Sequence, residues 1–149
     1  MKIAIGSDHA GYKLKEQIKN YLTQKGYEVI DNGCDSEESC DYPDYGEAVA
    51  NEVINNKCDF GCIICGTGIG ISISANKIPG IRAALCLSEE MAKYARLHNN
   101  ANILALGSRI KLLDDFKKII DAFLSTPFEG GRHERRINKI TNIERKYSC

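Results

Sequence analysis

The sequence predicts an α/β protein in which an open, mostly parallel sheet is covered by helices on both faces. Three observations predict it: short apolar segments that stop at glycine, amphipathic segments between them, and short links that join the two kinds. The chain has 149 residues, of which 43% are hydrophobic, enough for one ordinary domain with a real core. We therefore expect a single domain over residues 1–149, with a helical tail from about residue 128.

The expected strands are short and largely apolar, as strands buried on both faces tend to be. Residues 2–6 and 60–65 are the clearest cases, and residues 27–31 form a further strand between them. Residues 81–87 and 101–107 follow later in the chain. In a parallel sheet of this kind, ligands bind at the carboxyl ends of the strands.

The expected helices alternate with these strands. Apolar side chains recur at helical spacing around Leu14 and Ile18, and Gly26 is expected to close that helix. Ser88 can cap a later helix above two glutamates. The other helical segments are near residues 43–56, up to about residue 77, and 112–124.

Charge and cysteine content exclude several classes of protein. Lys plus Arg and Asp plus Glu each number 20, so no global field attracts nucleic acid or a membrane surface. No segment approaches the length of a membrane span, and the N-terminus lacks the apolar run of a signal peptide. The seven cysteines are an odd number scattered among apolar segments. We expect free thiols and a cytoplasmic protein without nucleic-acid or membrane partners.

The turn after residues 60–65 is the sharpest local feature, and it reads Cys65-Gly66-Thr67-Gly68-Ile69-Gly70. Alternate glycines let backbone amides surround an anion at a helix N-terminus, as an oxyanion hole or a phosphate cradle. Close packing is the alternative reason for the glycines. Cys65 stands where aligned amides would stabilise a thiolate, so it is a candidate base or nucleophile. The other cysteines are expected to be inert core residues.

Three competing motifs do not fit, for reasons of spacing, residue type and strand geometry. The turn reads GxGxG after a third strand, whereas a dinucleotide fingerprint reads GxGxxG after the first. Residues 6–11 imitate a phosphate-binding Walker loop, but Tyr12 and Lys13 follow where Lys and Ser or Thr should stand. Cys62 and Cys65 spell C-x-x-C, yet residues three apart on a strand face opposite sides of the sheet.

Two histidines flank expected strands. Asp8 and His9 directly follow the first strand, and His98 with Asn99 comes just ahead of residues 101–107. We expect both histidines at the same functional edge of the sheet, beside the glycine turn.

Two arginines in the basic tail, Arg132 and Arg136, are four residues apart and share one face of a helix. They either clamp a phosphate together or form a solvated basic face paired with Glu134 and Glu144.

The segments Ser7-Asp8-His9-Ala10-Gly11, residues 65–70 and His98-Asn99-Asn100-Ala101-Asn102 together resemble the B-type ribose-5-phosphate isomerases. The resemblance spans nearly the whole chain. It implies a Rossmann-like three-layer α/β/α sandwich with a five-stranded parallel sheet. It also implies a homodimer or dimer of dimers without metal or organic cofactor.

Residue roles follow from the same resemblance. Cys65 corresponds to the base that removes the carbon proton, and His98 to the acid that opens the sugar ring. Some family members place a glutamate base in the loop, but residues 71–74 read Ile-Ser-Ile-Ser here, so the cysteine version applies. Thr67 can relay a proton between the two oxygens. The expected substrate-binding residues are Asp8, His9, Tyr42, Gly66, Thr67, Gly68, Ile69, Gly70, Asn99, Arg132 and Arg136.

The expected reaction is interconversion of ribose 5-phosphate and ribulose 5-phosphate through an enediolate. Allose 6-phosphate and galactose 6-phosphate remain alternative substrates, because related isomerases act on them. If the basic tail crosses to a neighbouring subunit, Arg132 or Arg136 completes the partner's phosphate pocket. A sugar-phosphate sensor without catalysis and a thiol oxidoreductase using Cys62 and Cys65 are the rival functions.

Overall fold

The computed structural model describes residues 1–148 and contains one five-stranded sheet of order β2-β1-β3-β5-β4. All four neighbouring pairs are parallel, which confirms the predicted sheet. The strand expected over residues 81–87 is shorter than predicted. The strands are β1 (Lys2–Ser7), β2 (Glu28–Asp31), β3 (Phe60–Cys65), β4 (Ala83–Leu85) and β5 (Ile103–Gly107).

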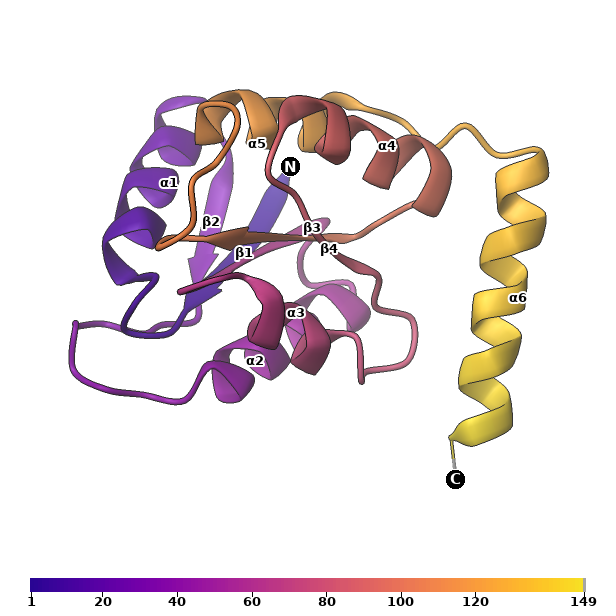
Figure 1. Ribbon diagram of the computed structural model, residues 1–149, viewed down its shortest axis with the longest axis horizontal. Coiled ribbons are helices and arrows are strands. Elements are labelled where there is room, and N and C mark those ends of the chain that lie inside the picture. Colours follow the sequence, from indigo (N-terminus) through magenta and orange to yellow (C-terminus); the bar gives the residue numbers. More distant parts are fainter. Residues whose placement is uncertain (149) are drawn as a thin grey trace.

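Helices cover both faces of the sheet, as Figure 1 shows. One face packs against α1, α4 and α5, and the other packs against α2 and α3. The three-layer arrangement predicted from the family resemblance is therefore confirmed. The helices are α1 (Tyr12–Gln24), α2 (Tyr42–Ile54), α3 (Ile69–Ala75), α4 (Glu89–Asn99), α5 (Phe116–Ser125) and α6 (Arg132–Tyr147).

The core consists of two clusters of buried side chains separated by the sheet. Alternation along β3 sends Cys62 into one cluster and Cys65 into the other. The two sulfurs therefore point to opposite faces, as the strand geometry predicted.

Local signals set several helix ends. Gly26 has φ of +83°, the left-handed conformation expected of a residue that closes a helix. Ser88 Oγ accepts a hydrogen bond from the Met91 amide at 3.1 Å and caps α4. The helix expected from residue 112 begins only at residue 116, because the Asp115 side chain caps the Lys117 amide at 2.9 Å.

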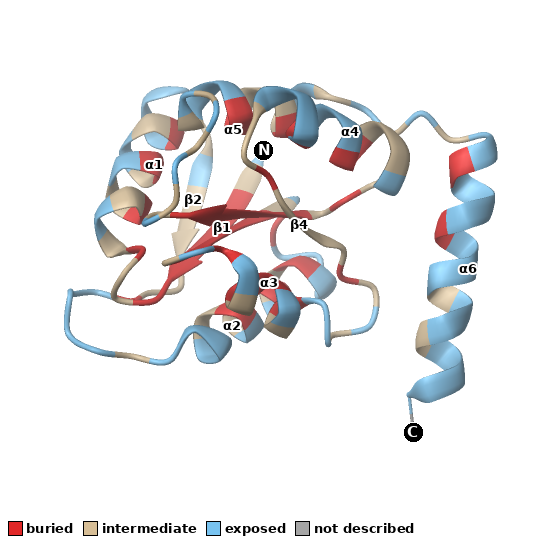
Figure 2. Ribbon diagram, in the orientation of Figure 1, coloured by how far each residue is buried: buried red, intermediate tan, exposed pale blue. Residues whose placement is uncertain are grey.

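The C-terminal helix α6 stands beside the three layers and contacts them mainly at its first turns (Figure 1). Figure 2 shows it exposed along most of its length, with His133 and Ile137 as its buried residues. Ile140, Ile143 and Tyr147 continue its apolar stripe, although they are 40%, 59% and 74% exposed. Within residues 1–148, no helix has the length and apolar character needed to cross a membrane.

Candidate active site

The glycine turn places the Cys65 thiol at the carboxyl end of β3, under the start of α3. The Gly68 amide donates a hydrogen bond to Cys65 Sγ at 3.1 Å, and the thiol is only 4% exposed. The Ile69 amide donates to Thr67 Oγ1 at 3.2 Å, so that hydroxyl keeps its own proton to donate elsewhere. An N–H group aimed at the sulfur is the contact that a thiolate uses.

The three glycines of the turn differ in what they do. Gly68 has φ of +76°, and a Cβ there would lie 2.8 Å from the carbonyl carbon of Leu106. A Cβ on Gly70 would lie 2.7 Å from the Tyr42 ring. Gly66 is more open, because the nearest atom to its Cβ position is Arg109 Cδ at 3.4 Å. Close packing therefore requires two of the glycines, whereas a Cβ on Gly66 would make only ordinary contacts.

The turn after β1 lies against the glycine turn. A Cβ on Gly11 would be 2.7 Å from the carbonyl oxygen of Ile64, so the two backbones are in close contact. Asp8 Oδ1 accepts a hydrogen bond from the Gly11 amide at 3.0 Å and shapes this turn. His9 Nδ1 lies 3.2 Å from both the amide nitrogen and the carbonyl oxygen of Cys40, which fixes the imidazole ring on the loop before α2.

The residues after β5 join the same edge, although they are not among those expected from the sequence. Ser108 Oγ donates to the carbonyl oxygen of Ala10 at 2.7 Å and lies 3.2 Å from that of Cys65. The Arg109 amide donates to the carbonyl oxygen of Gly66 at 2.8 Å. The rule that ligands bind at carboxyl ends, applied to β5 as well as to β1 and β3, identifies both residues.

His98 and Asn99 lie at the opposite edge of the sheet, so the expectation that both histidines share one edge is wrong within a single chain. A crossover helix returns from the carboxyl end of one parallel strand to the amino end of the next. Residues that directly precede β5 therefore lie near the start of β3, where Gly61 donates a hydrogen bond to the Asn102 carbonyl at 3.0 Å. At about 3.3 Å per residue, roughly 13 Å of strand separates Gly61 from Cys65.

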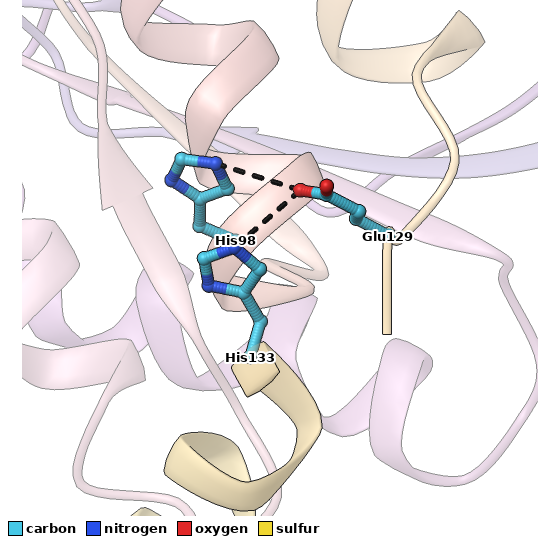
Figure 3. A group of neighbouring side chains, drawn as sticks. All are labelled: His98, Glu129 and His133. Carbon is cyan, nitrogen blue, oxygen red and sulfur yellow. Dashed lines mark ion pairs between the residues drawn. The ribbon is translucent and has the colours of Figure 1, made fainter. Parts of the chain in front are cut away.

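At this amino edge His98 meets the loop before α6 and the helix itself. His98 Nε2 and His133 Nε2 lie 3.7 Å and 3.4 Å from the same oxygen of Glu129, as Figure 3 shows. The two imidazole rings are stacked, with centroids 4.1 Å apart and planes 11° apart. Arg132 Nε donates to His133 Nε2 at 3.4 Å, and Arg136 lies exposed one turn further along α6.

Two members of this cluster, Glu129 and His133, are not among the residues expected from the sequence. Burial lowers the pKa of His133, and the neighbouring charges of His98 and Arg132 act in the same direction. Together with His98 they bring three possible metal-ligand atoms within 4.8 Å of one another. The spacing of Glu129 and His133, four residues apart just before and inside a helix, is the sequence signal that points to them.

One chain thus carries two separate groups of site residues. The carboxyl edge holds the thiol, the glycine turn, Asp8, His9 and Tyr42. A cavity of about 370 Å³ beside Arg109 is near this edge, but none of these residues lines it. The amino edge holds His98, Asn99 and the two arginines. Here a cavity of about 630 Å³ between α6 and the segment before β4 is lined in part by Asn99, Arg82 and Ile143.

Comparison with known proteins gives one consistent result. The chain is 49% identical over 145 residues to ribose-5-phosphate isomerase B of Escherichia coli K12, covering 97% of each. The solved structure of Clostridium thermocellum ribose-5-phosphate isomerase B superposes with a TM-score of 0.97 at 57% identity, covering 99% of this chain and 100% of that one. The Mycoplasma genitalium enzyme with bound ribulose-5-phosphate superposes with a TM-score of 0.91 at 46% identity, covering 97% of each chain. The family model described as Ribose/Galactose Isomerase matches residues 3–140. The chain belongs to the ribose/galactose isomerase family.

Proposed function

We propose that this protein interconverts ribose 5-phosphate and ribulose 5-phosphate, with Cys65 as the base that moves the carbon-bound proton. The observation that carries the proposal is the Gly68 amide aimed at Cys65 Sγ from 3.1 Å, at the carboxyl end of β3. The relatives support the choice of sugar, because that of Escherichia coli is named ribose-5-phosphate isomerase B and that of Mycoplasma genitalium holds ribulose-5-phosphate.

The chemistry requires a base, an acid and a site for negative charge. Cys65 takes the proton from C2 of the open-chain aldose while the carbonyl oxygen gains charge, which backbone amides of the turn stabilise. Thr67 Oγ1 then relays a proton between the two oxygens, and the proton held by the thiol returns to C1. Ribose 5-phosphate is mainly cyclic in solution, so a separate acid must open the ring. Histidine changes charge near neutral pH, and His98 takes this role.

Two copies of the chain complete one site. A two-fold axis pairs the carboxyl edge of each copy with the amino edge of the other and so makes two identical sites. His98, Asn99, Arg132 and Arg136 of one copy then face Cys65 of the second copy, and the arginines bind the phosphate.

Exposed apolar side chains support such an interface. Ile69 and Ile73 on α3 are 52% and 54% exposed, while Tyr94 on α4 and Ile143 on α6 are 47% and 59% exposed. The proposed assembly is a homodimer or a dimer of dimers.

The state of the cysteines supports a proposal for the cell compartment in which the protein works. All six cysteines among residues 1–148 are free thiols, which supports a reducing compartment such as the cytoplasm.

The deciding experiment is proton exchange in heavy water. The purified protein is incubated with ribose 5-phosphate, allose 6-phosphate or galactose 6-phosphate, and NMR follows deuterium bound to carbon. We expect rapid incorporation with ribose 5-phosphate. Preference for a six-carbon phosphate would move the substrate assignment to one of the related isomerases.

A pair of cysteine variants tests the base. Cys65→Ala should abolish exchange but still bind the sugar phosphate, whereas Cys62→Ala, on the opposite face of the sheet, should retain exchange. Binding without exchange in the unmodified protein would instead favour a sugar-phosphate sensor.

A further inference from the structure

The Glu129–His133 pair has no assigned part in the reaction, yet both residues contact His98, the proposed ring-opening acid. Glu129 is 56% exposed, while the His133 side chain is 5% exposed and packs face to face on the His98 ring. The ring of Tyr94 lies on α4 with its centroid 4.9 Å from that of His98. In Figure 3 both imidazoles turn their Nε2 edges toward the same carboxylate.

The stacking argues against a shared metal ion as the purpose of this cluster. A metal–imidazole bond is about 2.0–2.1 Å long and lies near the plane of the ring. The planes of His98 and His133 are within 11° of parallel, with centroids 4.1 Å apart. An ion in the plane of one ring would therefore lie well out of the plane of the other.

We propose that Glu129 and His133 are positioning residues that fix the tautomer and orientation of His98, so that its Nδ1 atom delivers the ring-opening proton. This inference rests on the proposed function. The Glu129 carboxylate, 3.7 Å from Nε2 of His98, acts through its charge and favours the form that carries hydrogen on that nitrogen. The other nitrogen is then the one that exchanges a proton with the substrate, as in any histidine held on one side by a carboxylate.

The ring-opening step balances with these groups. The Nδ1 proton of charged His98 passes to the ring oxygen as the bond between that oxygen and C1 breaks. The anomeric hydroxyl loses its proton to water and becomes the aldehyde oxygen. Neutral His98 then regains a proton from solvent, while the negative charge of Glu129, 3.7 Å from Nε2, continues to favour hydrogen on that nitrogen.

His133 completes the arrangement because it remains neutral beside a histidine that must be charged. The groups that face it are His98 from α4, Glu129 from the preceding loop, and Arg132 and Arg136 from α6. Burial, His98 and the arginines all oppose a positive charge on His133 and lower its pKa. As a neutral ring it packs face to face on the His98 ring and supports it from its buried side.

The open-chain ketose separates this role from the rest of the reaction. Ribulose 5-phosphate cannot close a furanose ring, because its C5 oxygen carries the phosphate. Exchange of its C1 hydrogen with heavy water therefore needs the thiol and the glycine turn but no ring-opening acid. Consumption of ribose 5-phosphate needs the thiol and the glycine turn and, in addition, the ring-opening acid.

The test compares these two rates in Glu129→Gln and His133→Phe, with Glu134→Gln on the exposed face of α6 as the control. We expect kcat/KM for ribose 5-phosphate to fall about 10- to 100-fold in the first two variants. Deuterium incorporation into ribulose 5-phosphate should change less than about threefold, and the pH profile of the ribose 5-phosphate reaction should shift in Glu129→Gln. Glu134→Gln should leave both rates unchanged.

Equal losses in both rates would overturn the inference, since they would show a structural role or a part in enediolate chemistry. Unchanged rates in both assays would overturn it as well. Failure of the proposed function gives a different pattern, in which the unmodified protein catalyses no deuterium incorporation into the ketose or Cys65→Ala retains that incorporation.

Discussion

Mixing two inactive variants should restore activity if each site is built from two chains. Cys65→Ala removes the base from the carboxyl edge, and Arg136→Ala removes a phosphate ligand from the amino edge. Roughly 13 Å of β3 lies between these edges. At that distance neither substitution directly disturbs the site residues at the opposite edge. Each variant alone should lose most of its turnover of ribose 5-phosphate.

The size of the recovery follows from counting sites. Random reassortment of equal amounts of two homodimers makes about half of the dimers mixed, because each partner is drawn with equal chance. In a mixed dimer one site carries both lesions and the other site carries none. Half of the sites in half of the dimers are then intact, so activity per subunit should reach about one quarter of the unmodified value.

The assay is co-expression of differently tagged variants and measurement of ribulose 5-phosphate formation, first in the unfractionated mixture and then in the purified mixed species, where activity per subunit should rise to about one half of the unmodified value. Arg135→Ala, on the same helix but next to the proposed ligand, is the matched control and should stay active without mixing. Mixed dimers that remain as inactive as their parents would refute the shared site and would return His98 and Arg136 to the chain that carries Cys65.

Two further predictions concern stability. Gly68→Ala should lower the free energy of unfolding by about 2–5 kcal/mol in urea denaturation, from left-handed strain of about 1–2 and overpacking of about 1–3 kcal/mol. Gly26→Ala, whose φ is +83° but whose Cβ would meet nothing within 4 Å, should show the strain alone, and an equal loss in both would contradict the packing argument. Asp31 is partly buried, which opposes its charge, yet hydrogen bonds from Lys15 and Lys19 outweigh burial and lower its pKa below 3.8. Its charge therefore stabilises the fold above that pH, so Asp31→Asn should be about 1–3 kcal/mol less stable near neutral pH. This difference should shrink as the pH falls below about 3.8, and a difference independent of pH would contradict the role of the charge.

Much of the fold could be predicted because its signals are local. Apolar runs and helical spacing depend only on neighbours in the chain, and they located all five strands within a few residues. Turn chemistry is equally local, so the left-handed Gly26 and the cap at Ser88 follow from residue type. The opposite facing of Cys62 and Cys65 follows from strand alternation alone.

The grouping of the site residues was decided by the tertiary structure. Sequence order places His98 just before β5, but only the direction of the crossover helix shows that this is the far edge from Cys65. The stack of His98 on His133 with Glu129 joins residues from α4, from α6 and from the loop before α6. No periodic pattern encodes such a contact, because it depends on how separate elements pack in space. The sequence by itself therefore determined the sheet, its order of elements and the cysteine turn. The division of the remaining groups between two edges arose only when the helices packed on the sheet.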